Sequence, residues 1–276
     1  MLHGRAPTAI ENFATNLNAT NYYISGNGAL LYDMKNEEIL YDNYMTKEKV
    51  LEIVKECERN SIYYNVYTKT EMIAKKLNYN ILFYHYENSK KSEAEKANIN
   101  IVEDVYQYIK DSNHKQFLKL TICDNHKIIF NNIMKKIKKI KDIDVLDVAH
   151  MSRKLIKSGT KEIEIEYFYT EISNPNVNKW KALQVLIDQL NISKEEVIAI
   201  GDNANDLEMI KNAGVGVAMN SSAPYIKEQA DFITEDNNNS RRSSSNPKIY
   251  WIGLIVIQRR KVQQIQKNIT VILQWY

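Results

Sequence analysis

Two aspartates and three asparagines gather with three of the chain's eight glycines in one stretch, VIAIGDNANDLEMIKNAGVGVAM at residues 197–219. The apolar run 197–200 is typical of a strand that is buried on both faces of a parallel sheet. Asp202 would then lie at the carboxyl end of that strand, where open α/β sheets bind their ligands. An ordinary turn rich in Asp and Asn would explain Gly201-Asp202 alone, but not the whole block. The stretch therefore predicts carboxylates presented at a sheet edge.

The residues around this loop predict the elements that hold it. A helical stripe follows Asp206 and ends at Gly214, and residues 215–219 predict the next strand. Upstream, residues 179–190 predict a helix with an apolar stripe of Trp180, Leu183, Ile187 and Leu190. Downstream, residues 222–230 predict a helix and 231–234 a final strand. From residue 172 on, the pattern is thus one of alternating strands and helices.

The region before residue 172 alternates helices with hairpins, as in an α+β unit. The predicted strands are 22–25, 29–32, 38–41, 63–68, 81–86, 118–123, 145–148 and 162–168. The predicted helices are 46–59, 101–110 and 127–140. The first of these should begin at Thr46 as its N-cap and bury Val50, Ile53, Val54 and Cys57.

Charge and composition exclude several classes of protein. The net charge is +3, but residues 237–276 hold seven basic and no acidic residues, so the remainder carries −4. A body of that charge predicts no nucleic-acid partner. Cys57 and Cys123 are far apart and predict buried free thiols in a reducing compartment. No apolar run is long enough to span a bilayer, and no signal peptide is recognisable, so we predict a cytoplasmic protein with no membrane partner.

Two charged segments could be taken for functional sites, the first for a nucleic-acid or membrane contact and the second for a catalytic pair, but their context does not support this. The lysines of residues 135–141 fall on one face of a predicted helix, opposite Ile133, Ile137 and Ile140, which indicates a solvated helix face. Asp142-Ile143-Asp144 has the spacing of a catalytic aspartate pair. Because a lysine-rich helix and not a buried strand precedes it, we expect an exposed turn.

Three blocks together resemble the Cof-type phosphatases of the haloacid dehalogenase superfamily. They are Asn178-Lys179, residues 201–206 and residues 214–220, and nearer the start Gly4-Arg5 and residues 27–29 are similar to the family's second motif and the hairpin after it. The resemblance implies an α/β fold, with a doubly wound parallel sheet of Rossmann-like type and a smaller inserted α/β cap domain. It implies the core at residues 1–45 and 172–236, the cap at 46–171, and a basic tail of doubtful structure at 237–276.

The same resemblance implies the chemistry. The family hydrolyses phosphomonoesters with Mg²⁺, which offsets the repulsion between carboxylates and phosphate. By matching motif, Asp202 would bind the metal, and Lys179 and Asp206 would be catalytic. Phosphate or substrate would be bound by Gly4, Arg5, Asn27, Lys179 and Asn205. The partner would be a small phosphorylated metabolite such as a sugar phosphate. Taken alone, Lys179 would be an ordinary surface lysine at a helix start.

The chain also departs from the family pattern. The nucleophile motif Asp-x-Asp-Gly-Thr does not occur in it, His3 stands where the second motif has a hydroxyl, and Trp180 replaces a small residue. These departures predict a truncated or frame-disrupted reading frame that is inactive by itself and could be complemented by an N-terminal fragment. The alternative is a nucleophile-free protein that binds phosphate or sugar phosphate without turnover. We interpret Trp180 as a core residue, although it could instead crowd the phosphate.

Overall fold

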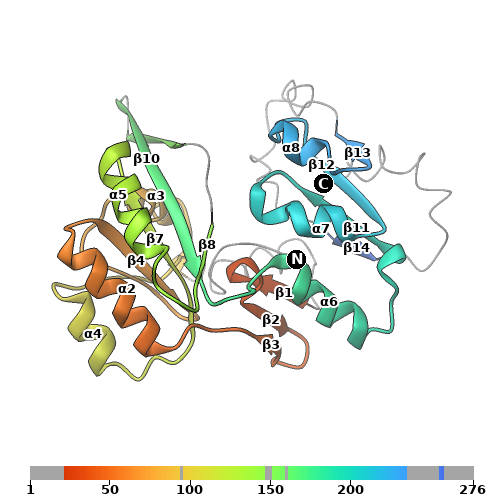
Figure 1. The fold of residues 1–276 in the computed structure, drawn as a ribbon, viewed down its shortest axis with the longest axis horizontal. Helices are drawn as coiled ribbons and strands as arrows, with labels where there is room; N and C mark the ends of the chain where they lie inside the picture. Colours follow the sequence, from red (N-terminus) through yellow and green to blue (C-terminus); the bar gives the residue numbers. More distant parts are fainter. Residues whose placement is uncertain (1–21, 94–95, 147–150, 159–160, 235–254, 258–276) are drawn as a thin grey trace. The chain divides into compact units, whose positions relative to one another are not determined.

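The computed structural model describes residues 22–93, 96–146, 151–158, 161–234 and 255–257. These residues belong to two compact units, which meet in the sequence between Val177 and Asn178 (Figure 1). The limits of the inserted domain, residues 46–171, stay a prediction, as does the division of the remaining chain around it.

The first unit begins with a three-stranded antiparallel sheet. Its strands are β1 (Tyr22–Ser25), β2 (Leu30–Asp33) and β3 (Glu38–Asp42). The 3-10 turn η1 (Gly26–Gly28) joins the first two strands, and Asn27 within it has a φ of 62°. Asparagine is among the few non-glycine residues that adopt this left-handed conformation readily. The glycine-rich hairpin predicted from the sequence is therefore confirmed.

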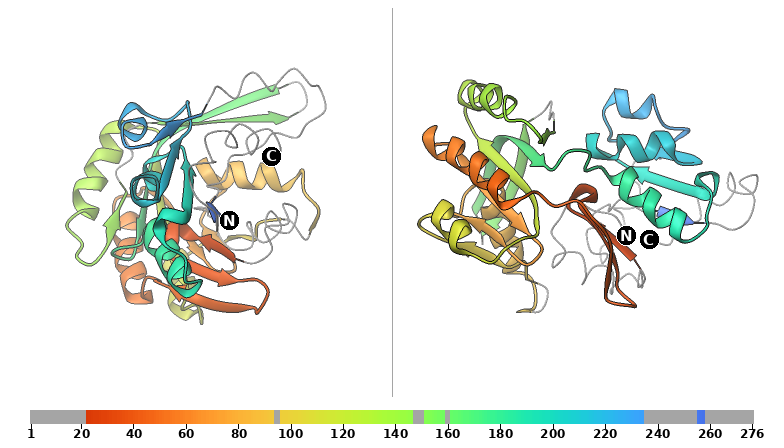
Figure 2. Two further views of the ribbon diagram at one scale, coloured as in Figure 1. Left: turned by 90° about the vertical axis from the view of Figure 1, so that its right-hand side faces the viewer. Right: turned by 60° about the horizontal axis from the view of Figure 1, so that its bottom comes forward.

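A second, larger sheet forms the body of the first unit. Its strand order is β6-β5-β4-β7-β10-β8, and β9 pairs with β10 off this path. The strands are β4 (Tyr63–Thr68), β5 (Met72–Ala74), β6 (Ile99–Ile101), β7 (Phe117–Asp124), β8 (Asp144–Val145), β9 (Ser152–Ser158) and β10 (Lys161–Ser173). Among the described residues, the amino-terminal half of β10 pairs only with β9, and the two form the long ribbon visible in Figure 2. Its carboxyl-terminal half pairs with β7 and β8.

Three helices pack on one face of this sheet. They are α2 (Lys47–Arg59), α4 (Val105–Asp111) and α5 (Lys127–Ile137), and their apolar residues share one core with Val66, Leu120 and Ile122 of the sheet. The Thr46 hydroxyl caps α2 by accepting from the Lys49 amide at 3.3 Å. Val50, Ile53, Val54 and Cys57 are all fully buried, as predicted. Burial of this stripe is what fixes α2 against the sheet.

The opposite face of the sheet is polar and aromatic. Because side chains alternate along a strand, Asn65 of β4, Thr121 of β7 and Glu171 of β10 all lie on this second face. The helix α3 (Tyr79–Asn88) contacts this face through Asn80, which donates to the Tyr67 hydroxyl at 2.9 Å.

The prediction of a strand at residues 81–86 is wrong, because these residues belong to α3. The run ILFYHY is aromatic and short, so its pattern alone does not separate a strand from a helix. Asn78 decides the outcome locally, since its side chain accepts from the Tyr79 amide as an N-cap. Tyr79 enters the helix with a φ of 45°, a conformation that nothing in the sequence indicates.

The second unit contains a four-stranded sheet with the order β13-β12-β11-β14. Its strands are β11 (Val197–Gly201), β12 (Val215–Ala218), β13 (Phe232–Ile233) and β14 (Ile255–Ile257). The first three are parallel, as predicted, whereas β14 runs antiparallel to β11. Helices α6 (Lys179–Gln189), α7 (Leu207–Asn212) and α8 (Pro224–Lys227) connect or precede these strands. The tail segment that forms β14 thus pairs with the strand leading to Asp202.

The predictions for the two cysteines, for the lysine-rich helix and for the exposure of Asp142 and Asp144 are also confirmed by the structure. Cys57 and Cys123 are buried and free. Helix α5 buries Phe130, Ile133, Met134 and Ile137 and exposes Lys135 and Lys136. Asp142 and Asp144 are exposed. Within the described ranges, no helix is long and apolar enough to cross a membrane.

The cap of α2 gives a test of the fold. Thr46→Ala should lower the free energy of unfolding by about 1 kcal/mol, because it leaves an amide of the first helical turn without its acceptor. Thr46→Ser keeps the hydroxyl and serves as the matched control. Urea denaturation followed by circular dichroism measures both variants, and equal midpoints for Ala and Ser would contradict the capping role.

Candidate active site

The carboxyl end of β11 positions the first part of the candidate site. All five residues of β11 are buried, and the strand pairs in parallel with β12 from Ile198 to Gly201. The chain then leaves the sheet at Asp202 and enters the 3-10 turn η4 (Ala204–Asp206), which leads into α7. A buried strand followed at once by a polar turn is what presents Asp202 at the sheet edge.

A buried ion pair joins α6 to this turn. Lys179 is the first residue of α6 because Asn178 caps the helix by accepting from the Lys181 amide at 2.8 Å. The Lys179 Nζ donates to Oδ1 of Asp206, and the two residues are only 5% and 2% exposed. A charge buried to this degree is tolerated only when it is paired. Lys179 is therefore not a surface lysine. Its residue type alone predicts a surface position, whereas its place in the motif does not.

Asp206 also organises the backbone of the loop. Its Oδ2 accepts from the backbone amides of Asp202 and Asn203, both at 3.1 Å. One carboxylate thus holds the lysine with one oxygen and the loop with the other. Asp206 is buried and both of its oxygens accept hydrogen bonds, so it constrains the positions of the Lys179 ammonium group and of the Asp202 backbone.

Gly201 is required by the close approach of Asp206. A Cβ added at position 201 would lie 2.3 Å from the Asp206 Cβ. Two carbon atoms that are not bonded to each other cannot come so close, so the surrounding structure would have to move. The Gly201-Asp202 dipeptide singled out in the sequence is therefore not a generic turn. At this position β11 can have no side chain, because the buried Asp206 packs directly against the backbone.

Asp202 is the carboxylate that this arrangement leaves accessible. Its side chain is exposed, yet neighbouring protein removes part of its hydration, and this partial burial raises the pKa of its carboxyl above 3.8. The negative charge of Asp206 raises the pKa of Asp202 further, while Lys179 lowers it. An accessible carboxylate whose charge is poorly stabilised by the protein alone is suited to receive a cation.

The second unit contains four of the predicted site residues, and a fifth belongs to the first unit. Lys179, Asp202, Asn205 and Asp206 all lie around the β11 end of the second unit. Asn27 belongs to the first unit, where its Nδ2 donates to Oε2 of Glu171 at 2.5 Å. Gly4 and Arg5 lie outside the described residues. Among the residues described, no three His, Cys, Asp or Glu side chains gather as a ready-made metal site.

One polar residue at this sheet edge was not identified from the sequence. Ser222 lies in the loop after β12, whose carboxyl end is next to that of β11. It is 5% exposed, and its hydroxyl has no hydrogen-bond partner in the part of the chain that the structure describes. The sequence could have identified Ser222 by its position after the second parallel strand, because the carboxyl ends of parallel strands lie at the same edge of the sheet.

Comparison with known proteins identifies the family. The sequence pattern of the haloacid dehalogenase-like hydrolases matches residues 3–241. Over 245 residues the chain is 24% identical to phosphatase YwpJ from Bacillus subtilis, which covers 85% of this chain and 81% of that protein. The solved structure of a haloacid dehalogenase-like hydrolase from B. subtilis superposes with a TM-score of 0.66 at 22% identity, covering 84% of this chain and 81% of that one. The predicted family resemblance and fold class are confirmed.

A shorter match has higher identity. Over 83 residues the chain is 35% identical to a phosphoglycolate phosphatase from Methanothermobacter thermautotrophicus, which covers 29% of this chain and 38% of that protein. The chain thus spans less than two fifths of the length of this relative.

The ion pair between Lys179 and Asp206 should dominate the stability of the second unit. Lys179→Met leaves a buried carboxylate unpaired and should lower the free energy of unfolding by about 3–5 kcal/mol. The double variant Lys179→Met, Asp206→Asn removes both charges and should recover a large part of that loss. Lys181→Met, an exposed lysine on the same helix, is the control. Urea denaturation of the four proteins provides the measurement, and a double variant no more stable than Lys179→Met would refute the pairing argument.

The raised pKa of Asp202 predicts a dependence of stability on pH. The folded state binds the Asp202 proton more tightly than the unfolded state, so this contribution to stability is lost as pH rises through the raised pKa. Asp202→Asn should therefore stabilise the cation-free protein at neutral pH by less than about 1 kcal/mol, since the group is exposed. The gain should vanish below the usual value of 3.8, where both states are protonated. Melting temperatures across this range test it, with Glu208→Gln as the control; a gain independent of pH would contradict it.

Proposed function

Because the chain belongs to the haloacid dehalogenase-like hydrolase family, we propose that it carries half of the active site of a Mg²⁺-dependent phosphomonoesterase of the Cof type. Its substrate would be a small phosphorylated metabolite such as a sugar phosphate. The observation that carries the proposal is the buried Lys179–Asp206 pair beside the accessible Asp202.

Lys179 supplies the positive charge that a phosphate requires. Its ammonium group has three donors, of which Asp206 takes one, so the lysine is oriented and still able to donate to a phosphoryl oxygen. A donor that is held in place before the substrate arrives stabilises developing negative charge without a cost of reorganisation. The ion pair with Asp206 would thus hold the Lys179 ammonium group in the place where the phosphate binds.

Asp202 would hold the magnesium ion. Mg²⁺ prefers oxygen ligands and is commonly bound by one or two protein carboxylates together with substrate oxygens and water. The donor set fits, because Asp202 is accessible while Asp206 is occupied by Lys179 and by two backbone amides. The metal would offset the repulsion between carboxylate and phosphate. Asn205, in the same turn, would help to bind the substrate.

The remaining half of the reaction needs a nucleophile. These 276 residues contain no Asp-x-Asp-Gly-Thr sequence. Covalent phosphoryl transfer requires a carboxylate aligned with the metal and the phosphorus. We therefore propose that hydrolysis depends on a segment carrying that motif in addition to these 276 residues.

The missing motif also favours a second candidate function. A protein that keeps Lys179 and Asp202 but lacks a nucleophile could bind phosphate or a sugar phosphate without turnover. The two functions differ in one measurable property, since both predict phosphate binding but only the first predicts hydrolysis after complementation.

Complementation tests the enzyme proposal. A segment bearing Asp-x-Asp-Gly-Thr after an apolar strand, fused ahead of Leu2 with His3→Thr, should produce Mg²⁺-dependent release of phosphate from para-nitrophenyl phosphate and sugar phosphates. In that fusion Asp202→Ala should abolish metal-dependent turnover. Lys179→Ala should lose roughly 10²–10³-fold in rate, as for removal of one preorganised donor. Lys181→Ala should retain the rate and serves as the control.

Two outcomes would overturn parts of the proposal. If the unmodified chain alone releases phosphate and Asp202→Ala abolishes this activity, no additional nucleophile is needed. If the fusion folds and binds Mg²⁺ but releases no phosphate, the binding function replaces the enzymatic one.

A further inference from the structure

The first unit contains a cavity at one end of its large sheet, where β4 begins and β7 ends. Its volume, about 350 Å³, lies in the range of cavities that hold small molecules. The last turn of α2, the start of β4, the segment between β5 and α3 and the end of β7 line it. All of these elements belong to the first unit, so the cavity is not part of the site built around Lys179 and Asp202.

Charged side chains of both signs line this cavity. Glu58 and Asp124 supply carboxylates, and Lys75 and Lys76 supply ammonium groups. A simple anion placed here would meet the two carboxylates, and a simple amine would meet the two lysines. A molecule that carries one charge of each sign matches the whole set.

The ion pair at the cavity is an open one. The Lys75 Nζ lies 3.9 Å from Oε2 of Glu58, too far for a hydrogen bond, and the two side chains are 51% and 38% exposed. By contrast, Lys49 and Glu52 of the same helix α2 form a hydrogen-bonded pair at 2.8 Å. Lys76 makes no ion pair with any residue that the structure describes. Because an exposed pair contributes little stability, Glu58 and Lys75 can turn to a ligand at small cost.

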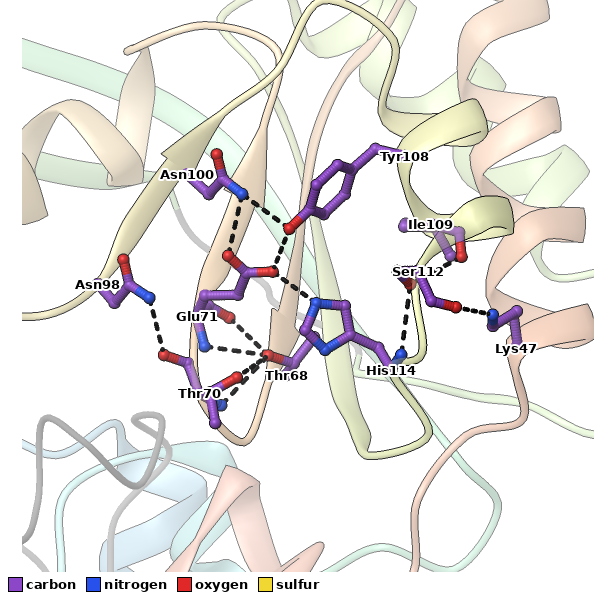
Figure 3. A network of polar contacts seen from close by, with 10 residues as sticks. All are labelled: Lys47, Thr68, Thr70, Glu71, Asn98, Asn100, Tyr108, Ile109, Ser112 and His114. Carbon is purple, nitrogen blue, oxygen red and sulfur yellow. Dashed lines mark hydrogen bonds and ion pairs between the residues drawn. The ribbon is translucent and has the colours of Figure 1, made fainter.

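A carboxylate elsewhere in the same unit shows what a closed arrangement looks like (Figure 3). Glu71 accepts from the Tyr108 hydroxyl at 2.9 Å and from Asn100 at 3.0 Å, and His114 Nε2 lies 2.6 Å from it. Both oxygens of Glu71 are thus bonded within the protein, and that network needs nothing further. Glu58 differs, because only its Oε1 accepts a hydrogen bond from a residue that the structure describes.

Tyrosines hold the charged groups in place and give the cavity an apolar wall. The Tyr64 hydroxyl donates to Oε1 of Glu58 at 2.6 Å, which orients the carboxylate and leaves Oε2 available. The Tyr63 hydroxyl donates to the Lys76 carbonyl at 3.0 Å, and its ring meets the ring of Tyr79 edge-on at 5.2 Å. Since hydroxyl groups of these tyrosines bond to the protein, their rings supply flat apolar surface to a ligand.

We propose that this cavity binds a free α-amino acid with an apolar or aromatic side chain. The ligand's ammonium group would donate to Oε2 of Glu58, and its carboxylate would accept from Lys75 and Lys76. Its side chain would lie against Tyr63 and Tyr79. The ligand thereby replaces one open ion pair with two closed ones. This binding is independent of the phosphatase function proposed for the second unit.

The two charges of the ligand provide the first test. Phenylalanine, tyrosine and leucine at millimolar concentration are each added to the full chain. Binding is measured by isothermal titration calorimetry and by the shift in melting temperature. At least one amino acid should bind and raise the melting temperature. The amine without its carboxylate, and the acid without its ammonium group, should each bind about tenfold more weakly, because each gives up a charge-assisted contact. No binding by any of the three amino acids, or equal binding by the matching amine or acid, would overturn the proposal.

Substitutions in the cavity provide the second test. Glu58→Gln removes the charge but keeps an acceptor for Tyr64, and Lys75→Met removes the opposite charge. Each should weaken binding of the amino acid by roughly tenfold or more. Lys49→Met is the matched control, because Lys49 also forms an ion pair with a residue of α2 but does not line the cavity. It should keep the wild-type affinity. The melting temperature without ligand shows that each variant is folded. Unchanged affinity in Glu58→Gln and Lys75→Met, or an equal loss in Lys49→Met, would refute the assignment.

Discussion

The buried contact between Lys179 and Asp206 is the interaction on which the second unit depends. It connects the first residue of α6 to the turn after β11, two segments that are 27 positions apart in the sequence. A lysine and a carboxylate removed from water stabilise a fold only when they meet. Their meeting holds the first turn of α6 against the turn after β11. Asp206 also fixes the backbone of residues 202 and 203, and its close approach requires a glycine at the end of β11. With Asp206 engaged in these contacts, Asp202 is the carboxylate of the loop that stays accessible.

The sequence predicts well those elements whose structure is determined by residues within the element itself. Helix α2 has an N-cap and a single apolar stripe, and its buried residues are the predicted ones. The β11 end was predicted because an apolar strand followed by a polar block has few other interpretations. The apolar stripe predicted for helix α6 is half right: Leu183 and Ile187 are buried. Ala182 and Leu186 are buried as well, while Trp180 and Leu190 are only partly buried. Its orientation follows from burying Lys179, and an apolar pattern cannot reveal a buried charge.

Features that depend on distant partners were not predictable. Helix α3 was mistaken for a strand because its aromatic residues suit either structure, and the face of the sheet it packs on is not local information. The contact of Asn27 with Glu171 joins residues 144 positions apart.

The crowding of Gly201 against Asp206 has a consequence for how the chain can change over generations. An alanine at position 201 is blocked while Asp206 is present, because the two β-carbons would occupy nearly the same space. Only a glycine at position 206 lacks that β-carbon, and it would also lack the carboxylate that pairs with Lys179. The order of mutational steps is therefore constrained: the ion pair must be dismantled before the glycine is free to vary. Positions 179, 201 and 206 are therefore physically coupled, and the effect of a substitution at any of them depends on which residues already occupy the other two.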